Sequence, residues 1–302
     1  MASSPLTMQE QSDFDQYALA VDVYASTWWD LADEPQKSRL KSAPHLRSAL
    51  DTMARDGRRI PTSNVYQDAG HWIPVRELLQ DTLIANELGE AGGSAEGSPN
   101  ACYFLLGLPG SGKTSVLREV ARAHAAAAGL ALSNRVSDAD QLRKALPEFA
   151  SGLGSDILQE EVVSMTYGDS SRPRARSLEE GVMRTAHAGS LVMIDVVGDP
   201  KYLPGSVTAL AERGWTVFVL VTQCSADEAV IRATRRALSD GRYTPLDLIW
   251  GSNLRPVRAL NAALRTEAVD GWALIDTEDS PARVVRGDGA FGDNGTLISL
   301  PV

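Results

Sequence analysis

The stretch ACYFLLGLPGSGKTS, residues 101–115, constrains the fold of this chain more than any other part of the sequence. It begins with an apolar run over residues 102–106, continues into a glycine-rich loop and ends in residues that favour a helix. The loop matches the phosphate-binding pattern G-x-x-x-x-G-K-[ST] at Gly107, Gly112, Lys113 and Thr114. We therefore predict a strand, a phosphate-binding loop and a helix, in this order.

Each residue type in this pattern has a physical role. Glycines let the backbone turn tightly so that successive N–H groups point at an anion, and the start of the helix adds a positive dipole end. Lys113 would reach the β- and γ-phosphates of a bound nucleotide, and the Thr114 hydroxyl would ligate Mg²⁺. The residues predicted to bind the nucleotide are Gly107, Leu108, Pro109, Gly110, Ser111, Gly112, Lys113, Thr114 and Ser115.

The composition excludes several classes of protein. A formal net charge of −10 over 302 residues argues against broad affinity for nucleic acids or anionic membranes. No apolar run approaches membrane-spanning length, and the N-terminus lacks the layout of a signal peptide. Cys102 and Cys224 lie in or beside predicted strands, which indicates reduced thiols in a cytoplasmic protein. The four His residues show no metal-ligand spacing.

A glycine- and serine-rich segment, residues 89–100, divides the chain. Before it, residues 14–53 and 73–88 have helical periodicity, and Pro74 suits the start of the second helix. We therefore predict a helical N-terminal region over residues 1–88, a linker, and a nucleotide-binding domain over residues 101–302.

Apolar strands alternate with helices after the loop, which predicts a three-layer α/β sandwich with a parallel central sheet. Residues 150–176 are rich in Gly, Ser and Arg, and we expect them to be irregular and to face a substrate. The strands predicted after the first are residues 130–136, 191–197, 215–222 and 272–275, with two short ones at 282–286 and 296–300. The predicted helices include residues 114–128, 177–188, 204–213 and 245–268.

Several carboxylates should lie at the carboxyl ends of these strands, where such sheets bind ligands. Asp138 and Asp140 follow the second strand, where one could accept a proton from a hydroxyl group; capping the next helix is an equal alternative on spacing alone. Asp195 closes the apolar run LVMID and could support Mg²⁺ through water. Glu179 lies early in a helix, where any carboxylate favours the helix dipole.

Arginines cluster after the fourth strand. Arg232, Arg235 and Arg236 share one face of a predicted helix, and Arg242 follows it. Guanidinium groups pair well with triphosphate oxygens, but the same pattern is typical of a solvated basic helix face, which spacing alone favours.

Taken in order, GLPGSGKTS, DADQLRKALPEF, the acid-bearing helix that leads to Asp195, and RRALSDGRYTP resemble the zeta toxins over about residues 70–276. The resemblance implies an adenylate-kinase-like core that transfers phosphate from ATP or GTP, with Mg²⁺, to the 3′-hydroxyl of UDP-N-acetylglucosamine or a related UDP-sugar. It also implies an antitoxin protein that blocks the nucleotide site.

The resemblance also implies roles for single residues. Lys113 would bind phosphate, Thr114 would bind the metal, and Asp140 would be the base that receives the proton of the sugar hydroxyl. Glu179 would contact the sugar nucleotide. The triphosphate would be bound by Arg235 or Arg236 together with Arg242. We group as candidate substrate-binding residues Asp138, Glu179 and Asp195.

The chain departs from the family at one place. Where the family typically has an acid, a glycine and a threonine, this sequence has Asp195, Val196 and Val197. Three functions therefore stay open: a kinase of a UDP-amino sugar, a kinase of another small molecule such as NAD, a nucleoside or an antibiotic, and a nucleotide-binding regulatory protein without phosphotransfer.

Overall fold

The structure is a computed structural model of the 302-residue chain. It describes residues 8, 61–89, 100–130, 135–146, 149, 157–185, 191–240, 244, 246–278, 281–288 and 291. The helices predicted over residues 14–53 and the strand predicted at 296–300 lie outside the described residues.

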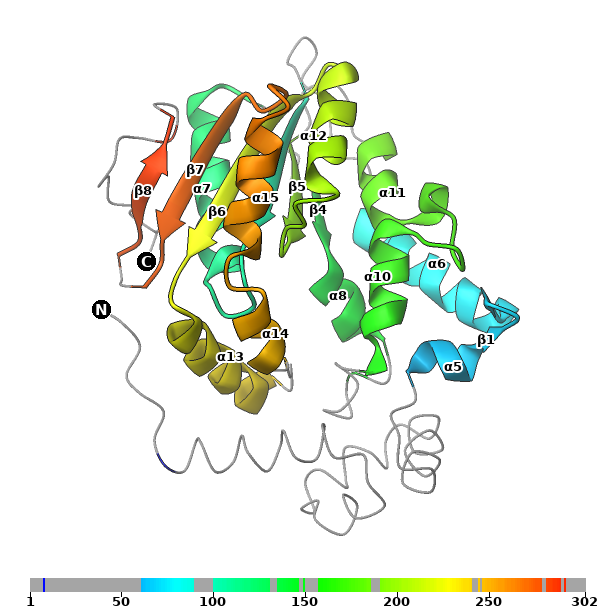
Figure 1. The fold of residues 1–302 in the computed structure, drawn as a ribbon. Helices are drawn as coiled ribbons and strands as arrows, with labels where there is room; N and C mark the ends of the chain where they lie inside the picture. Colours follow the sequence, from blue (N-terminus) through cyan, green and yellow to red (C-terminus); the bar gives the residue numbers. More distant parts are fainter. Residues whose placement is uncertain are drawn as a thin grey trace.

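A six-stranded sheet forms the centre of the molecule, with the strand order β4-β5-β3-β6-β7-β8 (Figure 1). Neighbours from β4 to β7 pair in parallel, and β8 joins the edge in antiparallel orientation. The predicted α/β fold with a mostly parallel sheet is confirmed. The strands are β3 (Ala101–Leu106), β4 (Arg135–Asp138), β5 (Leu191–Val196), β6 (Thr216–Gln223), β7 (Gly271–Asp276) and β8 (Arg283–Gly287).

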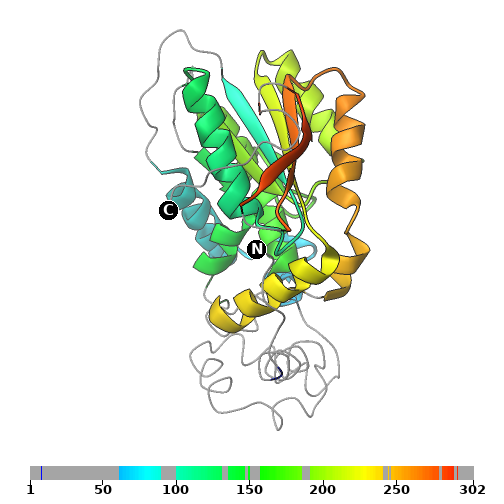
Figure 2. The same cartoon turned by 90° about the vertical axis from the view of Figure 1, so that its left-hand side faces the viewer.

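Helices cover both faces of this sheet. Helix α7 (Lys113–Ala127) lies on one face, and α12 (Leu203–Glu212) and α15 (Arg255–Leu264) lie on the other, as the turned view in Figure 2 also shows. All six residues of β3 are buried. Tyr103 and Leu105 pack toward α7, and Phe104 packs into the core on the opposite face. The continuous apolar run thus becomes a strand that is covered on both sides.

The remaining helices extend the fold beyond β4 and below the carboxyl ends of the strands. They are α5 (Thr62–Tyr66), α6 (Pro74–Leu88), α8 (Ala139–Ala145), α10 (Gln159–Tyr167), α11 (Leu178–Thr185), α13 (Ala226–Asp240) and α14 (Leu246–Gly251), together with a short helical turn, η2 (Arg174–Arg176). A two-stranded ribbon of β1 (Gln67–Asp68) and β2 (His71–Trp72) precedes α6. Helix α6 has Pro74 as its first residue, as predicted, and packs against α8 and α11.

Two sequence predictions need correction. Residues 159–167 form the buried helix α10, so the expectation of an irregular segment over 150–176 is wrong there. Its Glu161 is fully buried because Arg76 and Gln80 of α6 bond to its carboxylate, and these partners are distant in sequence. Strand β4 (Arg135–Asp138) runs two residues past the end of the predicted strand at 136, because its pairing with β5 continues to Asp138; residues 131–134 of that prediction lie outside the described residues.

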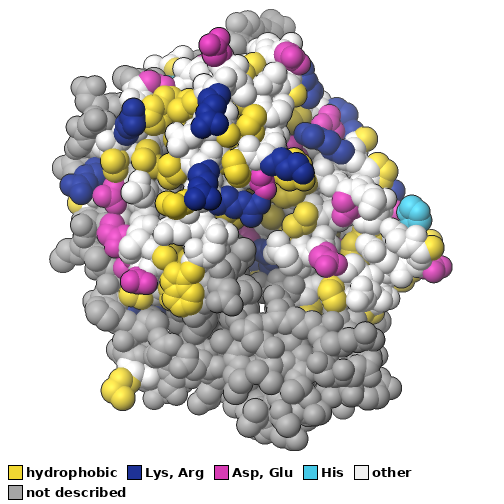
Figure 3. Space-filling model, in the orientation of Figure 1, with side chains coloured by type: hydrophobic (Ala, Val, Ile, Leu, Met, Phe, Trp, Pro, Cys, Tyr) yellow, Lys and Arg dark blue, Asp and Glu magenta, His cyan; other side chains and the backbone are white. Residues whose placement is uncertain are grey.

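The surface carries mixed charges. On the face that shows α12 and α15, basic side chains alternate with acidic and hydrophobic ones (Figure 3). Within the described residues, no helix is long and apolar enough to span a membrane.

Candidate active site

The phosphate-binding loop lies between β3 and α7, at the carboxyl edge of the sheet. Gly112 caps α7 with a φ of 77°, and Gly110 has a φ of 83°; both values are in the left-handed region that favours glycine. A Cβ on Gly110 would lie 2.2 Å from the carbonyl oxygen of Ala229 in α13. The loop therefore needs glycine for its conformation and also for its close approach to α13.

Hydrogen bonds of side-chain hydroxyl groups fix the conformation of this loop. The Ser111 hydroxyl donates to the carbonyl of Leu108 at 2.8 Å and lies 2.6 Å from the hydroxyl of Thr222, at the end of β6. The Thr277 hydroxyl, just after β7, donates to the carbonyl of Ser111 at 2.7 Å. The ends of β6 and β7 thus fix the shape of the loop before any ligand binds.

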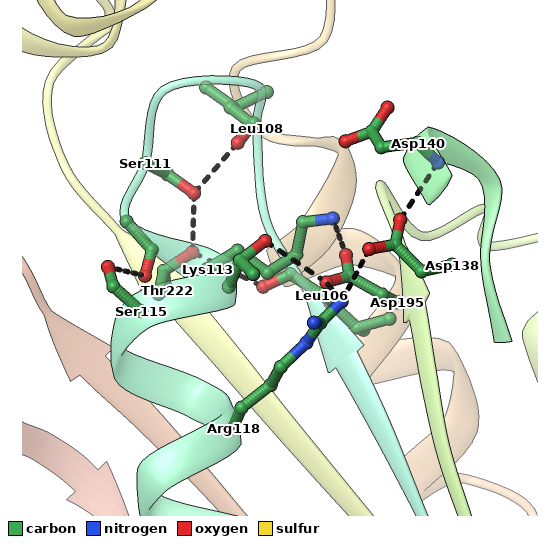
Figure 4. Close-up of polar contacts among 12 residues, drawn as sticks. Leu106, Leu108, Ser111, Lys113, Ser115, Arg118, Asp138, Asp140, Asp195 and Thr222 are labelled. Carbon is green, nitrogen blue, oxygen red and sulfur yellow. Dashed lines mark hydrogen bonds and ion pairs between the residues drawn. The ribbon is translucent and has the colours of Figure 1, made fainter. Parts of the chain in front are cut away.

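Lys113 and Thr114 both contact Asp195 of β5 (Figure 4). The Lys113 ammonium forms an ion pair with Oδ1, and the Thr114 hydroxyl donates to Oδ2 at 3.2 Å. A hydroxyl beside a buried carboxylate is an oxygen-rich pair of the kind that suits Mg²⁺. The described residues hold no group of three or more His, Cys, Asp or Glu side chains that could bind a metal.

The acidic residues that follow β4 have separate roles in the structure. Asp138 caps α8, because its Oδ1 accepts the amide N–H of Asp140 at 2.9 Å. The Asp140 carboxylate pairs with Nη1 of Arg143 at 2.5 Å. Asp138 is also directly opposite Asp195 in the parallel pairing of β4 with β5. The helix-capping alternative therefore holds for Asp138, while Asp140 presents its carboxylate at the same edge as Lys113.

Arg118 joins these carboxylates, and sequence reasoning missed it. Its Nη2 donates to Oδ2 of Asp138 at 2.6 Å and to Oδ2 of Asp195 at 3.1 Å (Figure 4). The available signal was its position four residues after Thr114, which places both on one face of α7.

Glu179 lies at the start of α11, where it is 9% exposed and accepts a hydrogen bond from Arg174 at 2.9 Å. Burial raises the pKa of Glu179, and the charge of Arg174 opposes this shift.

Tyr167, at the end of α10, is a second residue that sequence reasoning missed. Burial raises the pKa of its phenol, and the charges of Glu179, Asp138 and Asp140 add to this rise. Tyr167 was missed because its helix was not predicted.

The arginines of α13 are not equivalent. Arg232 pairs with Glu228 at 2.6 Å and donates to the carbonyl of Thr277 at 2.7 Å, so it is fixed beside the phosphate loop. Its Nη1 lies 3.8 Å from the place of a Cβ on Gly112. Arg235 and Arg236 are half-buried one turn further along α13. Arg242 lies outside the described residues.

A cavity of about 490 Å³ lies on the β6–β7 side of the phosphate loop. It is lined by residues of the loop, the ends of these strands and the start of α15, including Leu108, Gln223, Cys224, Asn253, Leu254 and Val257. Burial raises the pKa of the Cys224 thiol to about 11, so the thiol stays protonated at neutral pH.

Comparison with known proteins gives one family match. Residues 87–278 match the family described as Zeta toxin. No curated protein matches the chain.

The solved structures that the chain resembles are distant in sequence. AvrRxo1-ORF1:-ORF2 with ATP has a TM-score of 0.47 and 15% identity, over 79% of each chain. A structure from the PezAT chromosomal toxin–antitoxin system of the human pathogen Streptococcus pneumoniae has a TM-score of 0.47 and 16% identity, over 73% of this chain and 84% of that one. The native AvrRxo1-ORF1:-ORF2 complex has a TM-score of 0.43 and 14% identity, over 79% and 80% of the two chains.

Proposed function

The chain belongs to the zeta toxin family, and from this premise we propose that it is a kinase that transfers the γ-phosphate of ATP, or of GTP, to a hydroxyl of a UDP-amino sugar such as UDP-N-acetylglucosamine. One observation supports this proposal most. Lys113 and Thr114 of the phosphate loop share the carboxylate of Asp195, and Arg118 links that carboxylate to Asp138 and the start of the helix that carries Asp140. Phosphate-binding groups and a candidate base are therefore connected within one site.

The donor half of the site would work through the loop. Backbone N–H groups and the start of α7 would bind the phosphates, and Lys113 would turn from Asp195 to phosphate oxygens. Thr114 and Asp195 would hold Mg²⁺, which neutralises charge on the phosphates when bound. Arg235, Arg236 and Arg242 are our candidates for binding the triphosphate from α13 and beyond.

The acceptor half would centre on Asp140. Its carboxylate would take the proton of the acceptor hydroxyl while the new oxygen–phosphorus bond forms and the bond to the leaving nucleoside diphosphate breaks. Arg143 holds this carboxylate in place, with 2.5 Å between its Nη1 and Oδ1 of Asp140. Asp138, Glu179 and Tyr167 are our candidates for contacting the acceptor; the carboxylates of Asp138 and Glu179 lie near enough to the Tyr167 phenol to raise its pKa.

The proposal also predicts the direction in which the nucleotide binds. The γ-phosphate must lie near Asp140, on the β4–β5 side of the loop, so the nucleoside should lie on the β6–β7 side, where the cavity is. Leu254 lines this cavity and is 57% exposed, so Leu254→Trp should fill it without disturbing the core. We expect weaker binding of ATP and unchanged binding of inorganic triphosphate, measured by calorimetric titration. Equal losses for both ligands would contradict this direction.

The acceptor is the least constrained part of the proposal. Val196 and Val197 stand where the family typically has glycine and threonine, and this favours testing other hydroxyl compounds beside UDP-sugars. ATP and sugar nucleotides are made in the cytoplasm, where we place the reaction. By family membership, we also propose an antitoxin protein as a partner.

A phosphotransfer assay tests the proposal. The purified protein is mixed with ATP, Mg²⁺ and a pool of UDP-sugars, NAD and nucleosides, and the products are weighed by mass spectrometry. We expect one added phosphate on UDP-N-acetylglucosamine. Asp140→Ala should lower the rate of phosphotransfer by about two orders of magnitude or more. Lys113→Ala should abolish phosphotransfer. Asp68→Asn, an exposed substitution in β1, is the matched control.

Each outcome has a defined meaning. Phosphate on another compound would keep the kinase and reassign its acceptor. ATP binding without any product would favour the regulatory alternative. Full activity in Asp140→Ala would contradict the role of Asp140 as the base.

A further inference from the structure

Arg118 lies between the two halves of the site. It projects from the second turn of α7, its side chain is 13% exposed, and one nitrogen, Nη2, contacts two carboxylates that belong to different strands. Asp195 serves Lys113 and Thr114 on the donor side, and Asp138 caps the helix that carries Asp140 on the acceptor side. We infer that Arg118 is a positioning residue that couples the two halves, an inference that rests on the proposed kinase function.

Electrostatics gives Arg118 its first task. Asp138 and Asp195 are opposite each other in the sheet, and their side chains are 8% and 3% exposed. Two buried carboxylates at paired positions of neighbouring strands repel each other unless cations compensate their charges. Lys113 and Arg118 supply two positive charges, but Lys113 must leave Asp195 to bind phosphate. Arg118 can keep its contacts during this change, so Asp195 stays oriented toward Thr114.

Geometry gives it a second task. Arg118 holds Oδ2 of Asp138, and this leaves Oδ1 directed at the amide of Asp140. The first turn of α8 is thereby tied to α7, the helix that follows the phosphate loop (Figure 4). The position of Asp140 relative to a bound γ-phosphate thus depends on Arg118, although Arg118 need not touch either substrate.

The test compares two substitutions on one helix. Arg118→Met removes the guanidinium and keeps most of the aliphatic stem. Arg122→Met is the matched control, because Arg122 lies one turn later, is 37% exposed and pairs with Glu119 of the same helix. Arg118→Lys keeps the charge and serves as a second variant if the Met variant folds poorly. Three properties are measured: kcat, the binding of ATP, and amide hydrogen exchange of residues 139–145.

We expect Arg118→Met to lower kcat about a hundredfold, the scale of a small misplacement of a catalytic group, while ATP binding weakens far less than kcat falls. Exchange in α8 should accelerate, and exchange in β3 and β6 should not. Arg118→Lys should recover part of the rate, and Arg122→Met should match the unaltered protein in all three properties.

Two results would overturn the inference. One is unchanged kcat and unchanged exchange of α8 in Arg118→Met. The other is a loss of ATP binding in step with kcat and faster exchange throughout the sheet, which would mark a general structural role. If the unaltered protein phosphorylates no acceptor, the proposed function fails, and the exchange of α8 still decides whether Arg118 positions that helix.

Discussion

At the scale of single residues, Gly110 and Gly214 form a natural comparison. Both have left-handed backbones, with φ values of 83° and 78°, but only the Cβ of an alanine at 110 would meet a neighbour within 4 Å. Gly214→Ala should therefore cost about 1 kcal/mol of unfolding free energy from backbone strain alone. Gly110→Ala should cost more and also weaken ATP binding, because the loop must move away from Ala229. Urea unfolding and nucleotide titration measure both effects; equal losses would refute the role of the contact.

His124 should make the stability of the protein depend on pH. Its ring stacks on Phe291, with 4.3 Å between centroids, and its Nδ1 lies 2.7 Å from the hydroxyl of Tyr103. Burial lowers the pKa of His124, and Asp288 partly opposes the shift. Below about pH 6.5 His124 is therefore protonated in the unfolded chain but stays neutral in the folded protein, until the pH falls to the lower pKa of the folded state.

The unfolding free energy should thus fall as the pH falls through this window. His124→Gln should flatten the decline, which urea unfolding at about pH 7.5 and about pH 5.5 would reveal. The exposed His71 supplies the control, His71→Gln, which should keep the slope of the unaltered protein. A slope that survives in His124→Gln would assign the acid sensitivity to other groups.

At the scale of elements, the sequence predicts what depends on local signals. Strand β3, the phosphate loop and α7 are confirmed because each has its own pattern of apolar residues, glycines and helix formers. Helix α10 was not predicted, since Glu161 looks like an exposed residue until Arg76, 85 positions earlier, is placed beside it. The site follows the same rule. Asp195 was predicted because it ends an apolar strand. The role of Arg118 depends on its contacts with carboxylates of β4 and β5, which are distant from it in sequence.

The contact between α6 and α10 can be tested directly. Arg76 and Glu161 are 5% and 0% exposed, with 2.7 Å between Nε and Oε1. Arg76→Met should lower the unfolding free energy by about 3–5 kcal/mol, because it leaves a buried carboxylate short of its cation. Adding Glu161→Met should restore part of this loss. Arg176→Met is the control, since Arg176 is 41% exposed and should cost at most about 1 kcal/mol. Additive losses in the double variant would contradict the coupling.

At the scale of the whole molecule, the family match begins inside an element of the described fold. The match starts at residue 87, near the end of α6, while Trp72 and Ile84 are already buried in the structure. The full chain of residues 1–302 should therefore show a cooperative thermal transition for the part of the fold that α6 completes. A chain of residues 87–302 should lose this cooperative transition, because Glu161 and Arg172 would be buried without the side chains of α6 that bond to them. Calorimetry compares the two chains, and a cooperative transition in the shorter one would contradict this expectation.

The ion pair between Arg76 and Glu161 also restricts how this protein can evolve. Its partners are encoded 85 positions apart, yet neither tolerates the loss of the other in the folded state. A lineage that exchanges this pair for apolar residues must pass through an intermediate that folds poorly. Recombination with a divergent relative, at any crossover between the two codons, would separate the partners in one step. Viable hybrids should therefore inherit both positions from the same parent.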